Sequence, residues 1–319
     1  MRFIFRRERP VAAYRPIFSR MDHVRPLPDG ISIADVEMPV PGRWLKNANS
    51  GSQQVILYLH GGAFSMRLLN GHTAMVSDFC AKAGASAFIP FYRLAPEHPF
   101  PAAPDDCLAA YRWLLDHGHR PENIVVMGDS AGGNLSLSIL HLIKRDQLPM
   151  PRGVIALSPI TDAAQISATW RQNRTLDPMY VVQGAVNPAR WYFAGQNPLN
   201  PAISPYYGDY SGFPPLYFMV GGVEALLEDS VGMVRKAVES GIPAKVQVWR
   251  GMPHVFPLIA MLPEAKLATG EIVGWLAEML LPPVKTARED LYKSCVEWCD
   301  LQAFTHRLFR ETNDVYFQY

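Results

Sequence analysis

The segment GDSAG at residues 128–132 has the residue types that a nucleophilic serine requires. It follows an apolar run of strand character, 123–127, and precedes a helical run, 134–145. A serine on such a sharp strand-to-helix turn lies on strained backbone with its hydroxyl exposed, and the flanking glycines remove side chains that would collide with neighbouring elements. The N-terminus of the following helix favours developing negative charge. Ser130 is therefore the candidate nucleophile.

A general base for this serine is predicted at His254. A serine hydroxyl is a poor nucleophile by itself, so it requires a base, and the base requires a carboxylate that orients it. Two histidines lie far enough downstream, His254 and His306. His254 lies in a loop just past the predicted strand 245–249, at a strand's carboxyl end, where parallel sheets present their ligand-binding groups. His306 lies in a C-terminal stretch without a clear pattern.

The orienting carboxylate is expected in the segment GGVEALLEDS at residues 221–230, directly after the predicted strand 216–220. Glu224 is the first carboxylate past that strand. Glu228 and Asp229 fall one turn into the predicted helix, where acidic side chains cap or stabilise a helix N-terminus. Glu224 is therefore preferred to Asp229, since a glutamate serves a serine–histidine pair as well as an aspartate does.

Donors for a developing oxyanion are expected from the segment LHGGAF at residues 59–64, which ends another predicted strand. A glycine pair lets the backbone turn and present its N–H groups to a site. Gly61 and Gly62, with the N–H of Ala131, are expected to form the oxyanion hole. An ordinary Gly-Gly turn is the alternative, but the presence of the nucleophile motif favours the catalytic interpretation. His60 is expected to brace this loop by hydrogen bonding.

The elements that must position these residues alternate between strand and helix from residue 54 to residue 281. The strands are nearly continuous apolar runs, which is typical of a mostly parallel sheet with helices on both faces. The predicted fold class is therefore α/β, with a mostly parallel central sheet, helices on both faces and a cap. The predicted strands are 31–38, 42–46, 54–60, 85–92, 123–127, 153–157, 216–220 and 245–249, and the predicted helices are 71–82, 105–117, 134–145, 226–240 and 263–281.

The chain divides into a catalytic domain at 31–281 and two terminal segments. The connection at 158–214 is too long for an ordinary loop and rich in aromatic side chains, so a cap is expected at about 160–213. Residues 1–30 are expected to form the N-terminal part of that cap. Residues 284–319 form a tail whose role the sequence leaves open.

Composition limits the class of partner. The chain has 319 residues, with 30 basic against 29 acidic side chains, so nothing indicates a nucleic-acid partner. The four cysteines are interpreted as reduced, in a cytoplasmic protein. We find neither a secretory h-region behind the basic N-terminus nor a run of about 18 apolar residues that would span a membrane.

These motifs together resemble the hormone-sensitive-lipase-like family of α/β-hydrolase esterases, of which the bacterial carboxylesterases are typical. The matching segments are LYLHGGAF (57–64), YRLAPE (92–97), GDSAGGN (128–134) and GMPH (251–254), with SP (204–205) and GFPP (212–215) before the acid. The similarity spans about residues 31–281. Two departures stand out: the family's third glycine in HGGG is Ala63, and its usual aspartate followed by Pro-Leu is Glu224 followed by Ala-Leu.

The resemblance implies hydrolysis of short to medium acyl esters through an acyl-enzyme, with a small-molecule ester substrate and neither cofactor nor metal. Relatives pair through their last strand, so 245–249 is the candidate edge for a homodimer. Two alternatives stay open. One is an amide, formamide or lactone hydrolase with the same site. The other is a ligand receptor on the same fold; plant gibberellin receptors resemble this family but lack the catalytic histidine, so His254 argues against it.

Overall fold

A single eight-stranded sheet forms the centre of the computed structural model, which describes residues 11, 15–16, 22, 26–37, 40–48, 54–178 and 191–280. The strands lie in the order β1-β2-β4-β3-β5-β6-β7-β8. Their bounds are β1 (Ile31–Val36), β2 (Gly42–Asn47), β3 (Val55–Leu59), β4 (Ser86–Pro90), β5 (Ile124–Asp129), β6 (Gly153–Leu157), β7 (Leu216–Gly221) and β8 (Ala244–Trp249).

The sheet is parallel everywhere except at one edge. β1 pairs with β2, and β2 with β4, in antiparallel register, whereas every pairing from β4 through β3, β5, β6 and β7 to β8 is parallel. The carboxyl ends of β3, β5, β7 and β8 therefore meet at one edge of the sheet. The segments predicted to carry the oxyanion donors, nucleophile, acid and base follow these four strands.

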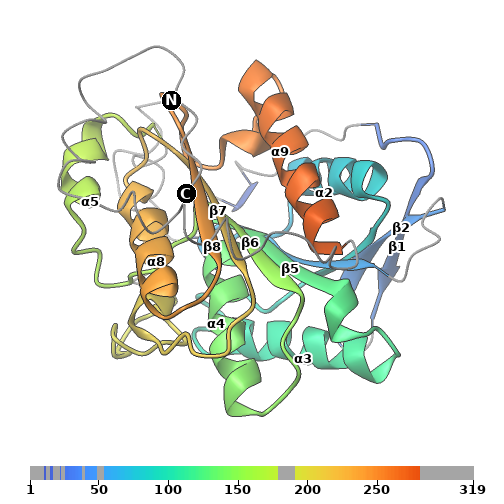
Figure 1. Cartoon of the computed structure of the whole chain (residues 1–319), viewed down its shortest axis with the longest axis horizontal. Coiled ribbons are helices and arrows are strands. Elements are labelled where there is room, and N and C mark those ends of the chain that lie inside the picture. The colour runs from blue at the N-terminus through green and yellow to red at the C-terminus, as the bar shows by residue number, and fades with distance from the viewer. Residues whose placement is uncertain are drawn as a thin grey trace.

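Helices cover both faces of the sheet, as the sequence predicts. α2 (Asn70–Ala83) and α9 (Pro263–Leu280) lie on one face, and α3 (Ala102–Asp116) and α4 (Ala131–Arg145) on the other, with α8 (Leu227–Glu239) (Figure 1). β3 shows how the sequence produces two cores. Leu57 and Leu59 belong to the core that includes residues of α3, α4 and α8, while the alternate residues Ile56 and Tyr58 belong to the core that includes residues of α2 and α9.

The expected cap is described in two parts, 158–178 and 191–214. The first holds the short helix α5 (Ala168–Gln172) and a 3-10 turn, η2 (Asn173–Thr175); the second holds another such turn, η3 (Pro205–Tyr207). Asn134 of α4 joins both parts, because its Nδ2 donates to the carbonyls of Ile160 and Ile203, each at 2.8 Å.

The expectations for the two chain ends concern residues that the structure describes in small part. Of 1–30, it describes 11, 15–16, 22 and 26–30; the tail 284–319 lies outside the described residues. Within the described part of the chain, no helix is both long and apolar enough to cross a membrane.

Candidate active site

Ser130 lies on the turn that its motif predicts, between β5 and α4. Its φ is 52° and its ψ −116°, a conformation that L-residues avoid. The glycines on either side are required by packing: a Cβ at Gly128 would overlap the carbonyl of Gly132, and a Cβ at Gly132 would overlap that of Leu59. The Ser130 N–H donates to the Leu157 carbonyl of β6 at 2.8 Å, which fixes the turn against the neighbouring strand.

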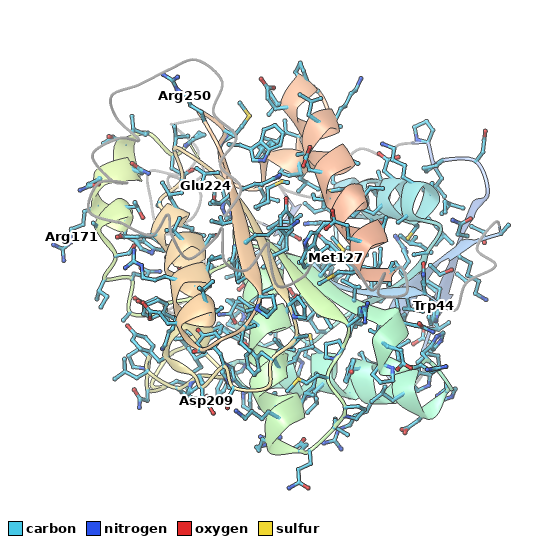
Figure 2. The ribbon with its side chains drawn as sticks, viewed as in Figure 1. Trp44, Met127, Arg171, Asp209, Glu224 and Arg250 are labelled. Atoms are coloured by element: carbon cyan, nitrogen blue, oxygen red, sulfur yellow. The ribbon has the colours of Figure 1, made fainter. Side chains whose placement is uncertain are left out.

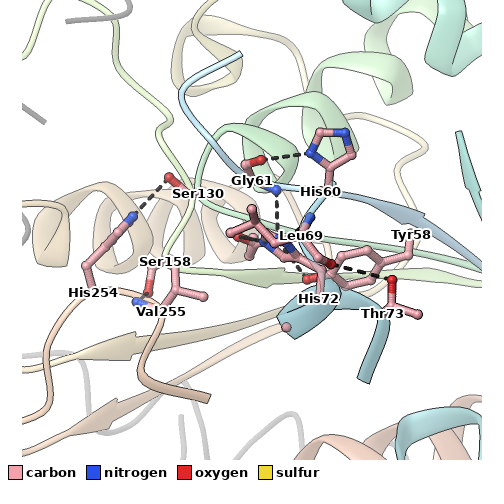
Figure 3. A network of polar contacts seen from close by, with 12 residues as sticks. Tyr58, His60, Gly61, Leu69, His72, Thr73, Ser130, Ser158, His254 and Val255 are labelled. Carbon is pink, nitrogen blue, oxygen red and sulfur yellow. Dashed lines mark hydrogen bonds and ion pairs between the residues drawn. The ribbon is translucent and has the colours of Figure 1, made fainter. Parts of the chain in front are cut away.

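His254 faces this serine from the loop after β8. Its Nε2 lies 2.9 Å from Ser130 Oγ, as Figure 3 shows. A base must lie within hydrogen-bond reach of the proton that it takes, and this distance satisfies that condition. The histidine is almost wholly buried, so water does not compete strongly for its ring nitrogens.

Glu224 completes the hydrogen-bonded series from the loop after β7. Its Oε2 accepts the Nδ1–H of His254 at 2.8 Å, and its side chain has no exposed surface. The proton on Nδ1 leaves Nε2 free to accept the serine proton. Burial lowers the pKa of His254, but the charge and hydrogen bond of Glu224 outweigh it and raise the pKa above its ordinary value of 6.5. Figure 2 shows Glu224 at the end of the sheet where Arg250 follows β8.

Asp229, the alternative acid, lies in the first turn of α8 and faces other groups. Its Oδ2 accepts the N–H groups of Thr161 and Asp162 at 2.7 and 3.1 Å. Its Oδ1 is buried without a hydrogen-bond partner among the described residues. Burial raises the pKa of Asp229 to about 7. This carboxyl group therefore holds the start of the cap and does not contact His254.

Gly61, expected to supply an oxyanion donor, has a different partner. Its N–H donates to Asp129 Oδ1 at 2.9 Å, so that group is not free for an oxyanion. The next two residues, Gly62 and Ala63, have φ of 118° and 54°. Their N–H groups have no acceptor among the described residues. The alanine that replaces the family's third glycine thus adopts a glycine-like conformation.

A buried network that the sequence analysis missed holds Asp129, the residue before the nucleophile. Tyr58 Oη donates to its Oδ1 at 2.7 Å, and His72 Nε2 lies 3.2 Å from its Oδ2. The Leu69 N–H donates to His72 Nδ1, so the proton of His72 is on Nε2, facing the carboxylate (Figure 3). Burial raises the pKa of Asp129, but His72, Tyr58 and the Gly61 N–H together hold it below its ordinary value.

Two residues of the segment 158–178 hold the main chain around Glu224, the candidate acid. Asn173 Nδ2 donates to the Glu224 carbonyl at 2.8 Å, and Asp177 Oδ2 accepts the Ala225 N–H at 3.0 Å. Neither residue lies in a motif. One sequence signal points to the partners of Asp129 that were missed, His72 and Tyr58. A buried carboxylate next to the candidate nucleophile needs hydrogen-bond donors.

His60 braces the loop of Gly61 and Gly62 as expected. Its Nδ1 lies 2.8 Å from the Gly61 carbonyl, its ring stacks on Tyr92, and Tyr92 Oη donates to the His60 carbonyl at 2.7 Å. Burial, followed by the proximity of His72, lowers the pKa of His60 to about 4. His60 is therefore neutral at physiological pH.

Within the described ranges, no group of three His, Cys, Asp or Glu side chains is placed to hold a metal ion.

Comparison with known proteins shows the family to which the chain belongs. The family model for the alpha/beta hydrolase fold matches residues 56–258, which span the strands from β3 to β8. The chain therefore belongs to the alpha/beta hydrolase fold family. An esterase of Acinetobacter venetianus is 32% identical over 270 residues, covering 84% of this chain and 89% of that protein. The carboxylesterase/phospholipase LipF of Mycobacterium tuberculosis is 34% identical, covering 76% and 67%.

Solved structures place the chain within that fold. An esterase from the bacterial hormone-sensitive lipase family superposes with a TM-score of 0.81 at 36% identity, covering 86% of this chain and 93% of that one. An esterase/lipase from an uncultured bacterium gives the same TM-score at 34% identity, covering 88% and 97%. The chain is thus a hormone-sensitive-lipase-like member of the family.

Proposed function

We propose that this protein is a carboxylesterase in which Ser130, His254 and Glu224 act as nucleophile, base and acid. The observation that carries the proposal is the continuous hydrogen-bonded series from Ser130 Oγ through both ring nitrogens of His254 to Glu224 Oε2, at 2.9 and 2.8 Å. Its nucleophile lies on a strained turn at the N-terminus of α4. The relatives described above are esterases, which supports an ester as the substrate.

The proposed reaction has two halves with the same geometry. Ser130 Oγ attacks the ester carbonyl carbon while its proton passes to His254 Nε2, and Glu224 stabilises the imidazolium. His254 then protonates the departing alkoxide as the C–O bond breaks, leaving an acyl-serine. Water attacks this acyl group, gives a proton to the same nitrogen and releases the carboxylic acid, which restores Ser130.

The oxyanion donors in this proposal are the N–H groups of Gly62, Ala63 and Ala131. Gly62 and Ala131 are kept from the expectation based on the sequence, and Ala63 takes the place of Gly61, because the Gly61 N–H is donated to Asp129. Ala131 begins α4, so its N–H has no partner within the helix, and the helix N-terminus adds favourable partial charge. Preorganised donors of this kind contribute about 3 to 4 kcal/mol each to transition-state stabilisation.

We propose acyl groups of short to medium length as substrates. Phe64 follows the oxyanion donors and stacks on Tyr192, with ring centroids 3.9 Å apart, and Phe193 meets Phe64 edge-on at 5.4 Å. Tyr192 and Phe193 belong to the cap, so an aromatic wall lies directly beside the oxyanion loop. One crystal structure of the relative EstE5 was soaked with p-nitrophenyl butyrate, a short-chain ester.

Turnover of p-nitrophenyl acetate, butyrate, octanoate and palmitate by the wild type and by Ser130→Ala tests the proposal. We expect turnover to be highest on the short esters, and kcat of the mutant to fall by about 10⁴- to 10⁶-fold. Circular dichroism and a thermal melt show whether the mutant is folded. A folded Ser130→Ala protein that keeps a tenth of the activity contradicts the nucleophile assignment. A folded wild type that hydrolyses a matched amide but no ester points instead to an amidase.

We also propose a homodimer joined through β8. This strand ends the sheet order and pairs with β7 alone among the described strands, which makes it an edge strand of the described sheet.

A further inference from the structure

Ser158 lies where the loops of the acid and the base meet. It directly follows β6, its N–H donates to the Met219 carbonyl of β7 at 2.8 Å, and its side chain is 1% exposed. Its hydroxyl contacts Glu224 Oε1 at 2.7 Å and the Val255 N–H at 3.1 Å. Figure 3 shows Ser158 beside Val255. Val255 directly follows His254. One hydroxyl therefore joins the acid to the main chain of the base.

Chemistry fixes the direction of both hydrogen bonds. The Val255 N–H can only donate, and an ionised carboxylate can only accept, so the hydroxyl proton points at Glu224. Gly221 N–H also donates to Glu224 Oε1, at 2.5 Å, while Oε2 accepts the His254 Nδ1–H. Each carboxylate oxygen thus has its own donors. Rotation of the carboxylate would break the hydrogen bonds on both sides.

Backbone conformation also distinguishes Ser158. Its φ is 48°, and the φ of Val255 is likewise 48°, although neither residue is a glycine. A β-branched residue at positive φ is a conformational outlier. Strain of this kind persists where surrounding contacts over-determine it, and it concentrates at active sites. Here the hydrogen bond from Val255 N–H to Ser158 Oγ joins the two strained residues directly.

We propose that Ser158 is a positioning residue for ester hydrolysis, and this inference rests on the proposed triad. Its hydroxyl holds the Glu224 carboxylate against His254 and holds the main chain that presents His254 to Ser130. Ser158 forms no bond to the substrate in this scheme; it acts through the acid and the base. Because a displacement of about 1 Å in a reacting group costs about 100-fold in rate, a hydroxyl that restrains two of the three catalytic groups has a large effect on kcat.

Two substitutions separate the hydroxyl from the backbone strain. Ser158→Ala removes the hydroxyl and keeps the strain, whereas Ser158→Gly removes the hydroxyl and accommodates the positive φ. On p-nitrophenyl butyrate we expect both variants to lose about 10- to 100-fold in kcat with KM unchanged within about twofold. The matched control is Ser138→Ala in α4, whose buried hydroxyl bonds to Asn134 Oδ1, and we expect wild-type kinetics from it. Wild-type kcat in either folded Ser158 variant overturns the proposal.

A double-mutant cycle distinguishes positioning from a structural role. In a Glu224→Ala background, Ser158→Ala is expected to cost clearly less kcat than in the wild type, because the carboxylate, one of the two groups that it positions, is gone. The same 10- to 100-fold loss in that background overturns the proposal. The downfield proton resonance of His254 Nδ1–H supplies a second readout, expected to shift or broaden in Ser158→Ala and to stay unchanged in Ser138→Ala. Full activity of Glu224→Ala alone refutes the triad itself, whereas an inactive Glu224→Ala beside a fully active Ser158→Ala refutes only the role of Ser158.

Discussion

Two buried carboxyl groups, Glu224 in the loop after β7 and Asp229 in the first turn of α8, differ in their surroundings. Glu224 accepts the His254 Nδ1–H on one oxygen and the Ser158 hydroxyl on the other. Asp229 has one oxygen bound to main-chain amides and the other buried without a partner among the described residues. Residue type alone does not separate the two groups; the hydrogen-bond partners do.

Glu224→Gln tests the acid at this scale. It keeps the size of the side chain and removes the charge, so we expect kcat to fall by about 10³- to 10⁴-fold. His254 must be neutral to accept the serine proton, so kcat/KM falls as the pH drops through the pKa of His254. Glu224 holds that pKa above 6.5. The acidic limb of the wild-type profile is therefore expected above pH 6.5, and it should move to lower pH in the variant, where burial is no longer outweighed by the charge of Glu224. An unshifted limb contradicts the assignment.

Asp229→Asn is the matched control. We expect its kcat to stay within a factor of about three of the wild type.

The folded pKa of Asp229, about 7, exceeds the ordinary value of 3.8, so the folded state binds more protons than the unfolded state between these values. The contribution of this group to stability is therefore present at low pH and is lost as the pH rises to about 7. Asp229→Asn is expected to remove that part of the pH dependence in urea unfolding.

At the scale of elements, Asp129 joins the loop after β3 to the turn after β5. Its carboxylate accepts the Gly61 N–H, and its main chain leads directly into Ser130. The proposed oxyanion donors and the nucleophile are therefore held by a single buried side chain. The contact requires a glycine at position 61, since a Cβ there would overlap Asp129 Oδ2.

Gly61→Ala is expected to disrupt this junction. The added methyl group has no space, so Asp129 or the loop must shift, and we expect kcat to fall by about 100-fold or more with a lower melting temperature. Gly270→Ala in α9 is the control, because nothing lies within 4 Å of a Cβ at that position. It should leave activity unchanged and stabilise the protein by about 0.5 to 1 kcal/mol. Equal activity of the two variants would remove the role we give to this junction.

At the scale of the whole molecule, segments far apart in sequence meet at the oxyanion loop. Arg15 donates to the carbonyls of Ser65 and Ala95 at 2.8 and 2.9 Å and forms a bidentate pair with Glu97 at 2.6 and 2.8 Å. This pairing lowers the pKa of Glu97 to about 2. The cap residue Tyr192 stacks on Phe64 from the same loop. An N-terminal segment and the cap therefore both contact the loop that carries the proposed oxyanion donors.

The outer edge of β8 leads to a prediction about assembly. Because an edge strand is a ready template for pairing with another chain, we expect a two-fold dimer in which two copies of β8 lie side by side. Static light scattering over a tenfold range of protein concentration measures the mass directly, and the expected value is twice the 35.7 kDa of one chain. A mass of one chain throughout the range would exclude the dimer.

Local patterns in the chain were enough to predict the order and type of the main elements and the motif that places Ser130. Strand and helix patterns between residues 54 and 281 predicted the mostly parallel sheet, because burial on both faces leaves continuous apolar runs and βα crossovers leave a regular alternation. The GDSAG turn could be predicted for a similar reason, because its glycines are required by local packing around a single residue, Ser130. His254 and Glu224 followed from their places just past strands whose carboxyl ends meet at one edge.

Which groups contact one another across that edge could be seen only in the folded chain. Hydrogen bonds depend on tenths of an ångström and on side-chain direction, which spacing along the chain does not encode. The N–H of Gly61 was expected to face an oxyanion, yet it is donated to Asp129, and Ser158 and His72 gained partners although neither lies in a catalytic motif. Asp229 and Glu224 could likewise be told apart only by their surroundings, since burial and hydrogen-bond partners are properties of the folded chain.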